Sequence, residues 1–375
     1  KMSFVLTFIL SFSLSLAIYP LVKRLAFFSN AISVPTKDRH IHNKPVPLLG
    51  GLSIIFGFLI ALLANYLFNG HFVAEKELLG LVCGVLIIVI MGILDDIIEL
   101  NPLIKVLFQV IAAVTAVVIS GSRIEFFTNP NALTSVILLN PVFSFVVTIF
   151  WIVALTNAFN LVDGLDGLAS GTGAICALTL FVVSLIRPDA EMLGSYAAIV
   201  TIALAGACLG FLPFNFNPAK IFMGESGSAF IGFTLAMVSM QGTLKSYTAL
   251  SIFIPVVAFG LPLLDAVLAF FRRSIKGKPF YQGDRQHIHH KLTDDLGLSQ
   301  RTTVLILYSA SLILGVMSVI MARNGMKNIL VLLISMAVVL IAVIAFIYRP
   351  PKYVFGKVDK SDVSETEKLP EDEDE

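Results

Sequence analysis

The sequence contains few charged residues and few cysteines, and each scarcity excludes a class of protein. Only 14% of the 375 residues are charged, whereas 57% are hydrophobic. Soluble domains carry about 25% charged residues, so this composition indicates a polytopic membrane protein. Cys83, Cys176 and Cys208 lie in apolar runs without metal-ligand spacing, which excludes a disulfide framework. The net charge of +1 and the absence of an internal repeat argue against a nucleic-acid-binding protein and an inverted-repeat transporter.

Long apolar runs define the expected architecture. Runs of about twenty apolar residues, the length that crosses a bilayer, predict an all-α polytopic membrane protein with about eleven transmembrane helices. The expected spans are 3–22, 49–68, 78–94, 104–121, 142–161, 167–186, 193–213, 229–243, 249–271, 302–322 and 329–348. Residues 1–348 would form one integral-membrane domain. Residues 349–375 would form an acidic, disordered tail in the cytoplasm.

The distribution of cations predicts the orientation of these spans. Most of the 26 Lys and Arg residues gather on one side of the membrane if the 23–48 loop is cytoplasmic. The positive-inside rule then places the amino terminus outside and the carboxyl terminus in the cytoplasm. The 123–141 connection would lie outside, with a short strand at its start. Every unusual polar cluster of the sequence falls on the predicted cytoplasmic face, so we expect the clusters to converge on one site there.

The segment 157–167, with the sequence NAFNLVDGLDG, is the most informative of these clusters. It places two amides and two carboxylates at the end of an apolar run, where charges are costly unless they face water, a cation or the protein interior. Paired carboxylates followed by glycines suit a metal and a phosphate-bearing ligand. A capping cluster for the next helix would explain Asp163 or Asp166, but not both carboxylates together with Asn157 and Asn160.

Two further clusters carry carboxylates. Asp95 and Asp96 end the third expected span, where adjacent carboxylates favour a divalent cation, although a solvated helix end beside Lys105 is the simpler alternative. The turn 223–228, with the sequence MGESGS, precedes the eighth expected span. Its N–H groups can face an anion and Glu225 can ligate magnesium, although a serine cap before a helix is common.

The fourth cluster is the histidine segment between the ninth and tenth expected spans. His287, His289 and His290 match a zinc site by residue type but not by spacing. The surrounding cations, including Arg285, favour a clamp for phosphate groups, while contact with lipid headgroups is the alternative for the basic run as a whole. Asp265, inside the ninth expected span, suits a structural role and a functional role equally.

Together these motifs resemble the polyprenyl-phosphate N-acetylhexosamine-1-phosphate transferase superfamily, which includes the phospho-MurNAc-pentapeptide translocase. The matching segments cover most of the chain in the order of the family. They are 45–51, Asp95–Asp96 with Lys105 and Gln109, 157–167, 215–228 and 284–290. The resemblance implies that a polyprenyl phosphate attacks the sugar-linked phosphorus of a UDP-sugar, giving polyprenyl-diphospho-sugar and UMP. It also implies a requirement for Mg²⁺, with Mn²⁺ as an alternative.

The resemblance assigns roles by motif position. Catalysis falls to Asp95, Asp96, Asp163, His287, His289 and His290; substrate binding to Lys44, Lys105, Asn157, Asn160, Asp166, Asn215, Phe222 and Arg285; and the metal to Asp95, Asp96, Asp163 and Glu225. The family usually has aspartate where this chain has Glu225. The extra methylene moves the carboxylate by about one carbon–carbon bond, which would change the geometry of the metal site.

The histidine pattern bears on the choice of sugar. The peptidoglycan branch typically has three consecutive histidines, whereas His287-x-His289-His290 resembles the branch that uses UDP-GlcNAc to begin teichoic acid, O-antigen or common antigen. We therefore expect UDP-GlcNAc and undecaprenyl phosphate as substrates in a multi-pass protein of the bacterial plasma membrane. UDP-GalNAc and the MurNAc-pentapeptide substrate are the alternatives within the family. The oligomeric state stays open, with a homodimer among the options.

A different class, the ion-coupled transporter, also carries intramembrane carboxylates and broken helices. Its carboxylates would lie near the middle of the bilayer. Here only Asp265 approaches that depth, and the other carboxylates gather at one face. The sequence therefore favours an enzyme.

Overall fold

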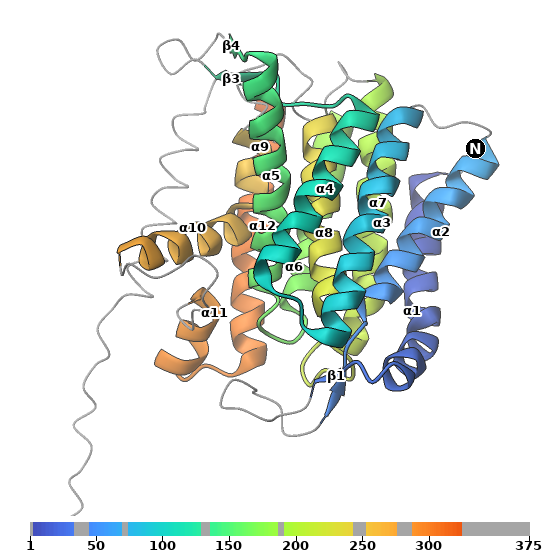
Figure 1. Ribbon diagram of the computed structural model, residues 1–375, viewed down its shortest axis with the longest axis vertical. Coiled ribbons are helices and arrows are strands. Elements are labelled where there is room, and N and C mark those ends of the chain that lie inside the picture. Colours follow the sequence, from blue (N-terminus) through green and yellow to red (C-terminus); the bar gives the residue numbers. More distant parts are fainter. Residues whose placement is uncertain are drawn as a thin grey trace, which may run out of the picture.

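The computed structural model describes residues 3–33, 45–69, 74–128, 136–186, 191–242, 253–275 and 287–324. These segments form a bundle of long, roughly parallel helices (Figure 1). The helices are α1 (Phe4–Phe28), α2 (Gly51–Asn69), α3 (Glu75–Ile98), α4 (Pro102–Ser120), α5 (Pro141–Val162), α6 (Leu168–Ile186), α7 (Glu191–Asn215), α8 (Gly224–Gly242), α9 (Phe253–Ala258), α10 (Gly260–Ile275), α11 (Ile288–His290) and α12 (Gln300–Asn324), with a π-helical turn, η2, at Lys291–Asp295.

Eight described helices, α1 to α7 and α12, are long and apolar enough to cross a membrane. They match the first seven expected spans and the tenth, which confirms a helical, polytopic membrane protein. The eleventh expected span, 329–348, and the tail, 349–375, lie outside the described residues. The total of eleven spans and the orientation of the chain stay predictions.

Helix α8 corresponds to the eighth expected span but lies in the middle of the bundle (Figure 1). Every side chain from Ser226 to Gln241 is buried. Because neighbouring helices rather than lipid surround α8, its glycines, serines and threonine are tolerated where a lipid-facing helix needs a continuous apolar surface. This enclosure explains why the sequence of α8 is less apolar than those of the outer helices.

Close backbone contacts fix the first turn of α8 between α2 and α3. A Cβ atom on Gly92 of α3 would lie 2.2 Å from the Cα atom of Ser226, and one on Gly51 of α2 would lie 2.2 Å from the Cα atom of Gly227. Only glycine allows such an approach of helix backbones. The turn before α8 is thereby held against the end of α3, where the acidic pair lies.

Two short hairpins lie at opposite ends of the bundle (Figure 1). Strands β1 (Ile32–Ser33) and β2 (Val46–Pro47) pair antiparallel, as do β3 (Phe126–Thr128) and β4 (Val136–Leu138). The strand expected at the start of the 123–141 connection is therefore present in β3. Helices α4 and α5 begin at matching Asn-Pro pairs, where the Oδ1 atoms of Asn101 and Asn140 accept from backbone N–H groups at 2.9 Å.

The prediction of one continuous transmembrane helix over 249–271 is wrong. The described part is divided into α9 and α10 at Phe259, and α10 runs across the bundle instead of along it (Figure 1). Gly260 and Pro262 follow the break, and both residues disfavour an uninterrupted helix, because glycine is flexible and proline lacks an N–H donor. The uniform apolarity of the run concealed this change of direction.

Candidate active site

A cavity of about 760 Å³ opens at the end of the bundle that holds β1. Four segments that are far apart in the sequence meet around it: the end of α3, the turn after α5, the turn between α7 and α8, and α11. The residues singled out from the sequence that line it are Asp95, Asp96, Asn160, Asp163, Asp166, Asn215, Phe222, Glu225 and His290. The volume lies within the range of ligand pockets, about 300–1,000 Å³.

The adjacent aspartates Asp95 and Asp96 have different partners. The Oδ2 atom of Asp95 accepts from Lys105 Nζ at 2.8 Å, and its Oδ1 atom accepts from the Leu100 N–H at 2.8 Å. Asp96 instead reaches α8, accepting from the backbone N–H groups of Glu225 at 2.8 Å and Ser226 at 3.3 Å, and from the Ser226 hydroxyl at 2.9 Å. Asp96 is thus a capping residue for a helix distant in the sequence.

Lys105 joins this acidic pair to the turn before α8. Its Nζ atom also lies 3.1 Å from Glu225 Oε2, the oxygen that accepts from Asn160 Nδ2 at 2.7 Å. The side chain of Glu225 is 9% exposed and that of Asp95 is 12% exposed. Asn157 lies deeper, where its Nδ2 atom donates to Gln109 Oε1 at 2.5 Å. Asn157 therefore connects α5 to α4 and does not line the cavity.

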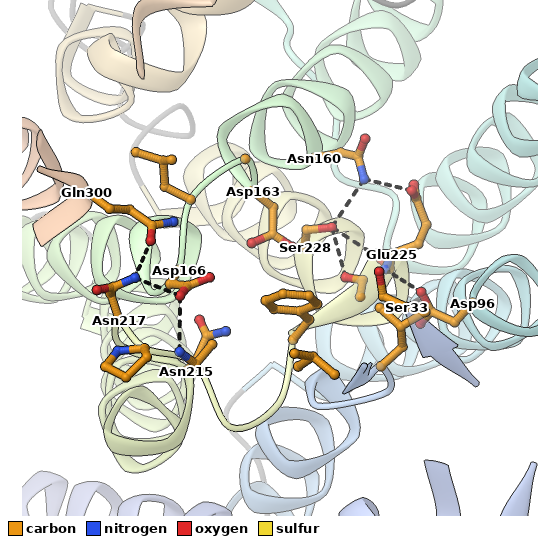
Figure 2. Close-up of a pocket in the computed structure, with 18 of the residues that line it drawn as sticks. Ser33, Asp96, Asn160, Asp163, Asp166, Asn215, Asn217, Glu225, Ser228 and Gln300 are labelled. Atoms are coloured by element: carbon orange, nitrogen blue, oxygen red, sulfur yellow. Dashed lines mark hydrogen bonds between the residues drawn. The ribbon is translucent and has the colours of Figure 1, made fainter. Parts of the chain in front are cut away.

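Asp163 is held differently from the other carboxylates. It follows the last residue of α5, and its side chain points into the cavity near Ser228 (Figure 2). No hydrogen bond to this carboxylate occurs within the described residues. Burial in the site, followed by the negative charges of Asp96, Glu225 and Asp166, raises the pKa of Asp163 to about 8.

An amide-rich wall faces these carboxylates across the cavity (Figure 2). Asp166 Oδ2 accepts from Asn217 Nδ2 and from the Ala219 N–H, both at 3.0 Å. Asn215 is 2% exposed; its Nδ2 donates to the Ile221 carbonyl at 3.1 Å and its Oδ1 accepts from the Ser170 hydroxyl at 3.1 Å. Both residues thus hold the 216–221 loop in place, which brings Phe222 to the cavity.

The three histidines occupy different environments. His290 lines the cavity, whereas His287 and His289 are buried beside it, 6% and 3% exposed. His289 packs on the turn after α5, since a Cβ atom on Gly164 would lie 2.1 Å from His289 Nε2. Burial lowers the pKa of His289 to about 3, so its ring is neutral at physiological pH.

The oxygen donors of the cavity fit a hard divalent cation that takes most of its ligands from water and substrate phosphates. Within the described residues, no group of three or more His, Cys, Asp or Glu side chains is close enough to hold one ion. Five carboxylates nevertheless line the cavity, and burial together with repulsion from three of the others raises the pKa of Asp163. A Mg²⁺ ion that keeps several waters and takes the rest of its ligands from substrate phosphates needs only one or two carboxylates.

Two predicted site residues cannot be located, and the cavity wall also contains residues that were not predicted. Lys44 and Arg285, expected to bind substrate, fall outside the described residues. The sequence reasoning missed Ser33 and Gln300 in the cavity wall. Gln300 is the first residue of α12, and its Oε1 atom accepts from Asn217. Gln300 lies ten residues after His290, and no motif in the sequence marked it as a site residue.

Comparison with known proteins places this site in context. Residues 78–243 match the model of glycosyl transferase family 4. The chain is 37% identical over 317 residues to the probable undecaprenyl-phosphate N-acetylglucosaminyl 1-phosphate transferase of Bacillus subtilis, covering 84% of each chain. It is also 37% identical over 304 residues to the decaprenyl-phosphate N-acetylglucosaminephosphotransferase of Mycobacterium tuberculosis, covering 76% of this chain and 74% of the relative.

A second kind of relative is less similar. The phospho-N-acetylmuramoyl-pentapeptide-transferase of Desulforudis audaxviator is 28% identical over 334 residues, covering 83% of this chain and 94% of the relative.

Proposed function

Because this chain belongs to glycosyl transferase family 4, we propose that it transfers N-acetylglucosamine 1-phosphate from UDP-GlcNAc to a polyprenyl phosphate. A phosphate oxygen of the lipid forms a bond to the sugar-linked phosphorus. The bond from that phosphorus to the bridging oxygen of the diphosphate breaks, and UMP leaves. The product is polyprenyl-diphospho-GlcNAc.

The observation that carries this proposal is the division of the cavity into a carboxylate side and an amide-rich side. Nucleotide-sugars have the same division, since a charged diphosphate is joined to a nucleoside that is read by hydrogen bonds and stacking. Asp166, Asn217 and Phe222 suit the nucleoside. Asp163, whose carboxylate has no hydrogen-bond partner within the described residues, suits the cation that accompanies the diphosphate.

We infer that Mg²⁺, or Mn²⁺ in its place, is the cation, and that Asp163 is its principal ligand. The bound ion supplies positive charge to the diphosphate, which five carboxylates would otherwise repel. In the described structure Glu225, Asp95 and Asp96 are engaged by Lys105 and by the first turn of α8. They therefore act mainly by fixing Lys105 and the turn before α8 beside the transferring group.

The acceptor needs little activation by the protein. A phosphate monoester has a second pKa near ~6, so the lipid phosphate is largely ionised at neutral pH. The residues of the cavity then act by orienting the two phosphates and by neutralising charge, which are the main contributions to phosphoryl transfer. His290, which lines the cavity, and Lys105, which contacts Asp95 and Glu225, suit this role.

The choice of GlcNAc follows from the pattern of relatives. The relatives named for N-acetylglucosamine transfer are 37% identical to this chain, against 28% for the pentapeptide transferase. The histidine spacing favours the same branch. We place the enzyme in the bacterial plasma membrane with the cavity facing the cytoplasm, where it would begin a cell-envelope glycopolymer such as teichoic acid or O-antigen.

The decisive test is the reaction of the purified full chain with undecaprenyl phosphate and Mg²⁺. UMP release and a radiolabelled lipid product should form with UDP-GlcNAc and be abolished by EDTA. UDP-GalNAc and UDP-MurNAc-pentapeptide are tested as alternative donors under the same conditions. A higher kcat/KM with either of them would reassign the substrate, and UMP release that does not depend on the lipid would overturn the proposed reaction.

A further inference from the structure

Asp265 is a buried carboxylate that the proposed reaction does not use. It lies on α10, is 3% exposed and is not part of the cavity wall. Its Oδ2 atom accepts from His287 Nδ1 at 3.0 Å, and its Oδ1 atom accepts from the Ile288 N–H at 3.0 Å. Both oxygens therefore hold the start of α11, 22 and 23 residues further along the chain.

A second contact fixes the same short helix to the turn after α5. His289, buried and neutral, packs on Gly164 in the turn that follows α5. This turn contains Asp163, the carboxylate that points into the cavity. Helix α11 is thus held between α10 and the Asp163 turn, and its last residue, His290, lies in the cavity wall.

Packing alone does not require a carboxylate at position 265. A carboxylate removed from water is costly unless it is paired and hydrogen-bonded, and an apolar side chain of similar size would fill the same space without that cost. The hydrogen bonds are directional, however, and they define both the orientation of the His287 ring and the path of the backbone at Ile288. An apolar residue defines neither.

We propose that Asp265 is a positioning residue which, through His287 and Ile288, sets the location of His290 at the reacting phosphates. The inference rests on the proposed function, because it assigns His290 to the substrate. It also divides the histidine segment. His287 anchors α11 to α10, His289 anchors it to the turn after α5, and His290 is the member that touches the ligand.

The test compares Asp265→Leu with Asp265→Asn. Asparagine keeps both hydrogen bonds, because its amide oxygen accepts from the Ile288 N–H and its NH₂ group donates to His287 Nδ1 in the other ring tautomer. Leucine keeps the volume and loses both bonds. We expect Asp265→Leu to lower kcat for UDP-GlcNAc at least tenfold and Asp265→Asn to stay within about threefold of the parent, with the affinity for UMP unchanged in both.

A double-mutant cycle separates positioning from general destabilisation. If Asp265 acts through His290, adding Asp265→Leu to His290→Ala lowers kcat no further than His290→Ala alone. The proposal is overturned if the two losses multiply, if Asp265→Leu retains the parental kcat, or if Asp265→Asn falls as far as Asp265→Leu. A parent protein that is inactive with UDP-GlcNAc would count against the proposed function instead.

His287→Phe provides an independent variant if Asp265→Leu does not fold. Phenylalanine keeps an aromatic ring beside His289, whose ring is stacked on that of His287 with centroids 5.7 Å apart, but it removes the bond to Asp265. We expect the same loss of kcat and the same lack of additivity with His290→Ala. Parental kcat in folded His287→Phe would overturn the proposal.

Discussion

At the scale of single residues, the carboxylates of the cavity differ in how their charge is compensated. Asp95 and Glu225 share Lys105, and Asp96 accepts three hydrogen bonds from the first turn of α8. Asp163 has neither kind of partner within the described residues, and its pKa is raised to about 8. Buried groups that lack compensation lower stability, and they persist where function requires them.

This difference predicts opposite effects on stability and activity at Asp163. Asp163→Asn removes the cost of burying a carboxylate and the repulsion from Asp96, Glu225 and Asp166, so the midpoint of thermal unfolding without Mg²⁺ should rise by about 2 °C or more. Turnover should fall by about a hundredfold or more, because the amide is a poor ligand for the cation. Calorimetry in detergent and the UMP-release assay measure the two effects. A variant that is less stable than the parent without Mg²⁺ would contradict this account of Asp163.

His289 gives a prediction for the dependence of stability on pH. Its pKa is lowered from 6.5 to about 3 in the folded protein. Below pH 6.5 the unfolded chain binds a proton that the folded chain does not bind until near pH 3, so stability is lost as the pH falls through this window. From pH 7 to pH 5 this one group should cost roughly 2 kcal/mol.

The matched variant for this measurement is His289→Gln, which has no titratable ring. The unfolding midpoint of the parent should fall more steeply between pH 7 and pH 5 than that of the variant. Parallel pH profiles for the two proteins would show that His289 is not held neutral by burial.

At the scale of helices, the apolar runs of the sequence predicted most of the bundle, because the length and hydropathy of a span are local properties. The sequence also predicted that the polar clusters meet in one site, because they lie at the ends of spans on the same predicted face. The division of the span 249–271 into α9 and α10 did not follow, since an apolar sequence suits a helix crossing the bundle as well as one running along it. The roles of Asp96 and Asp265 also escaped prediction, because their partners are distant in the sequence.

Helix α8 depends on α3 for its first turn, and this dependence can be measured. Asp96→Ala removes three hydrogen bonds to the turn at Glu225 and Ser226, so hydrogen exchange at the first amides of α8 should accelerate by about tenfold, corresponding to roughly 1 kcal/mol or more. Asp95→Ala is the matched control, since Asp95 contacts Leu100 and Lys105 instead. Equal exchange in the two variants would remove Asp96 as the cap of α8.

At the scale of the whole molecule, Ser33 of β1 lines the cavity, and β1 and the β3–β4 hairpin lie at opposite ends of the bundle (Figure 1). If the donor is a cytoplasmic nucleotide-sugar, as proposed, the cavity must face the cytoplasm while the acceptor lipid stays in the membrane. The cation distribution predicts the same orientation. Two exposed residues, Lys220 beside the cavity and Glu125 beside β3, mark the two ends.

Cysteine labelling in intact cells tests this orientation with little background. Cys176 and Cys208 are fully buried, so replacing Cys83 alone should remove most reaction of the parent with a membrane-impermeant maleimide. In that background Glu125→Cys should be labelled in intact cells, and Lys220→Cys only after permeabilisation. His287 is buried and would stay unlabelled from either side, which makes Lys220 the informative position. Labelling of Lys220→Cys in intact cells, with Glu125→Cys protected, would place the cavity outside the cell and exclude a cytoplasmic nucleotide-sugar as its substrate.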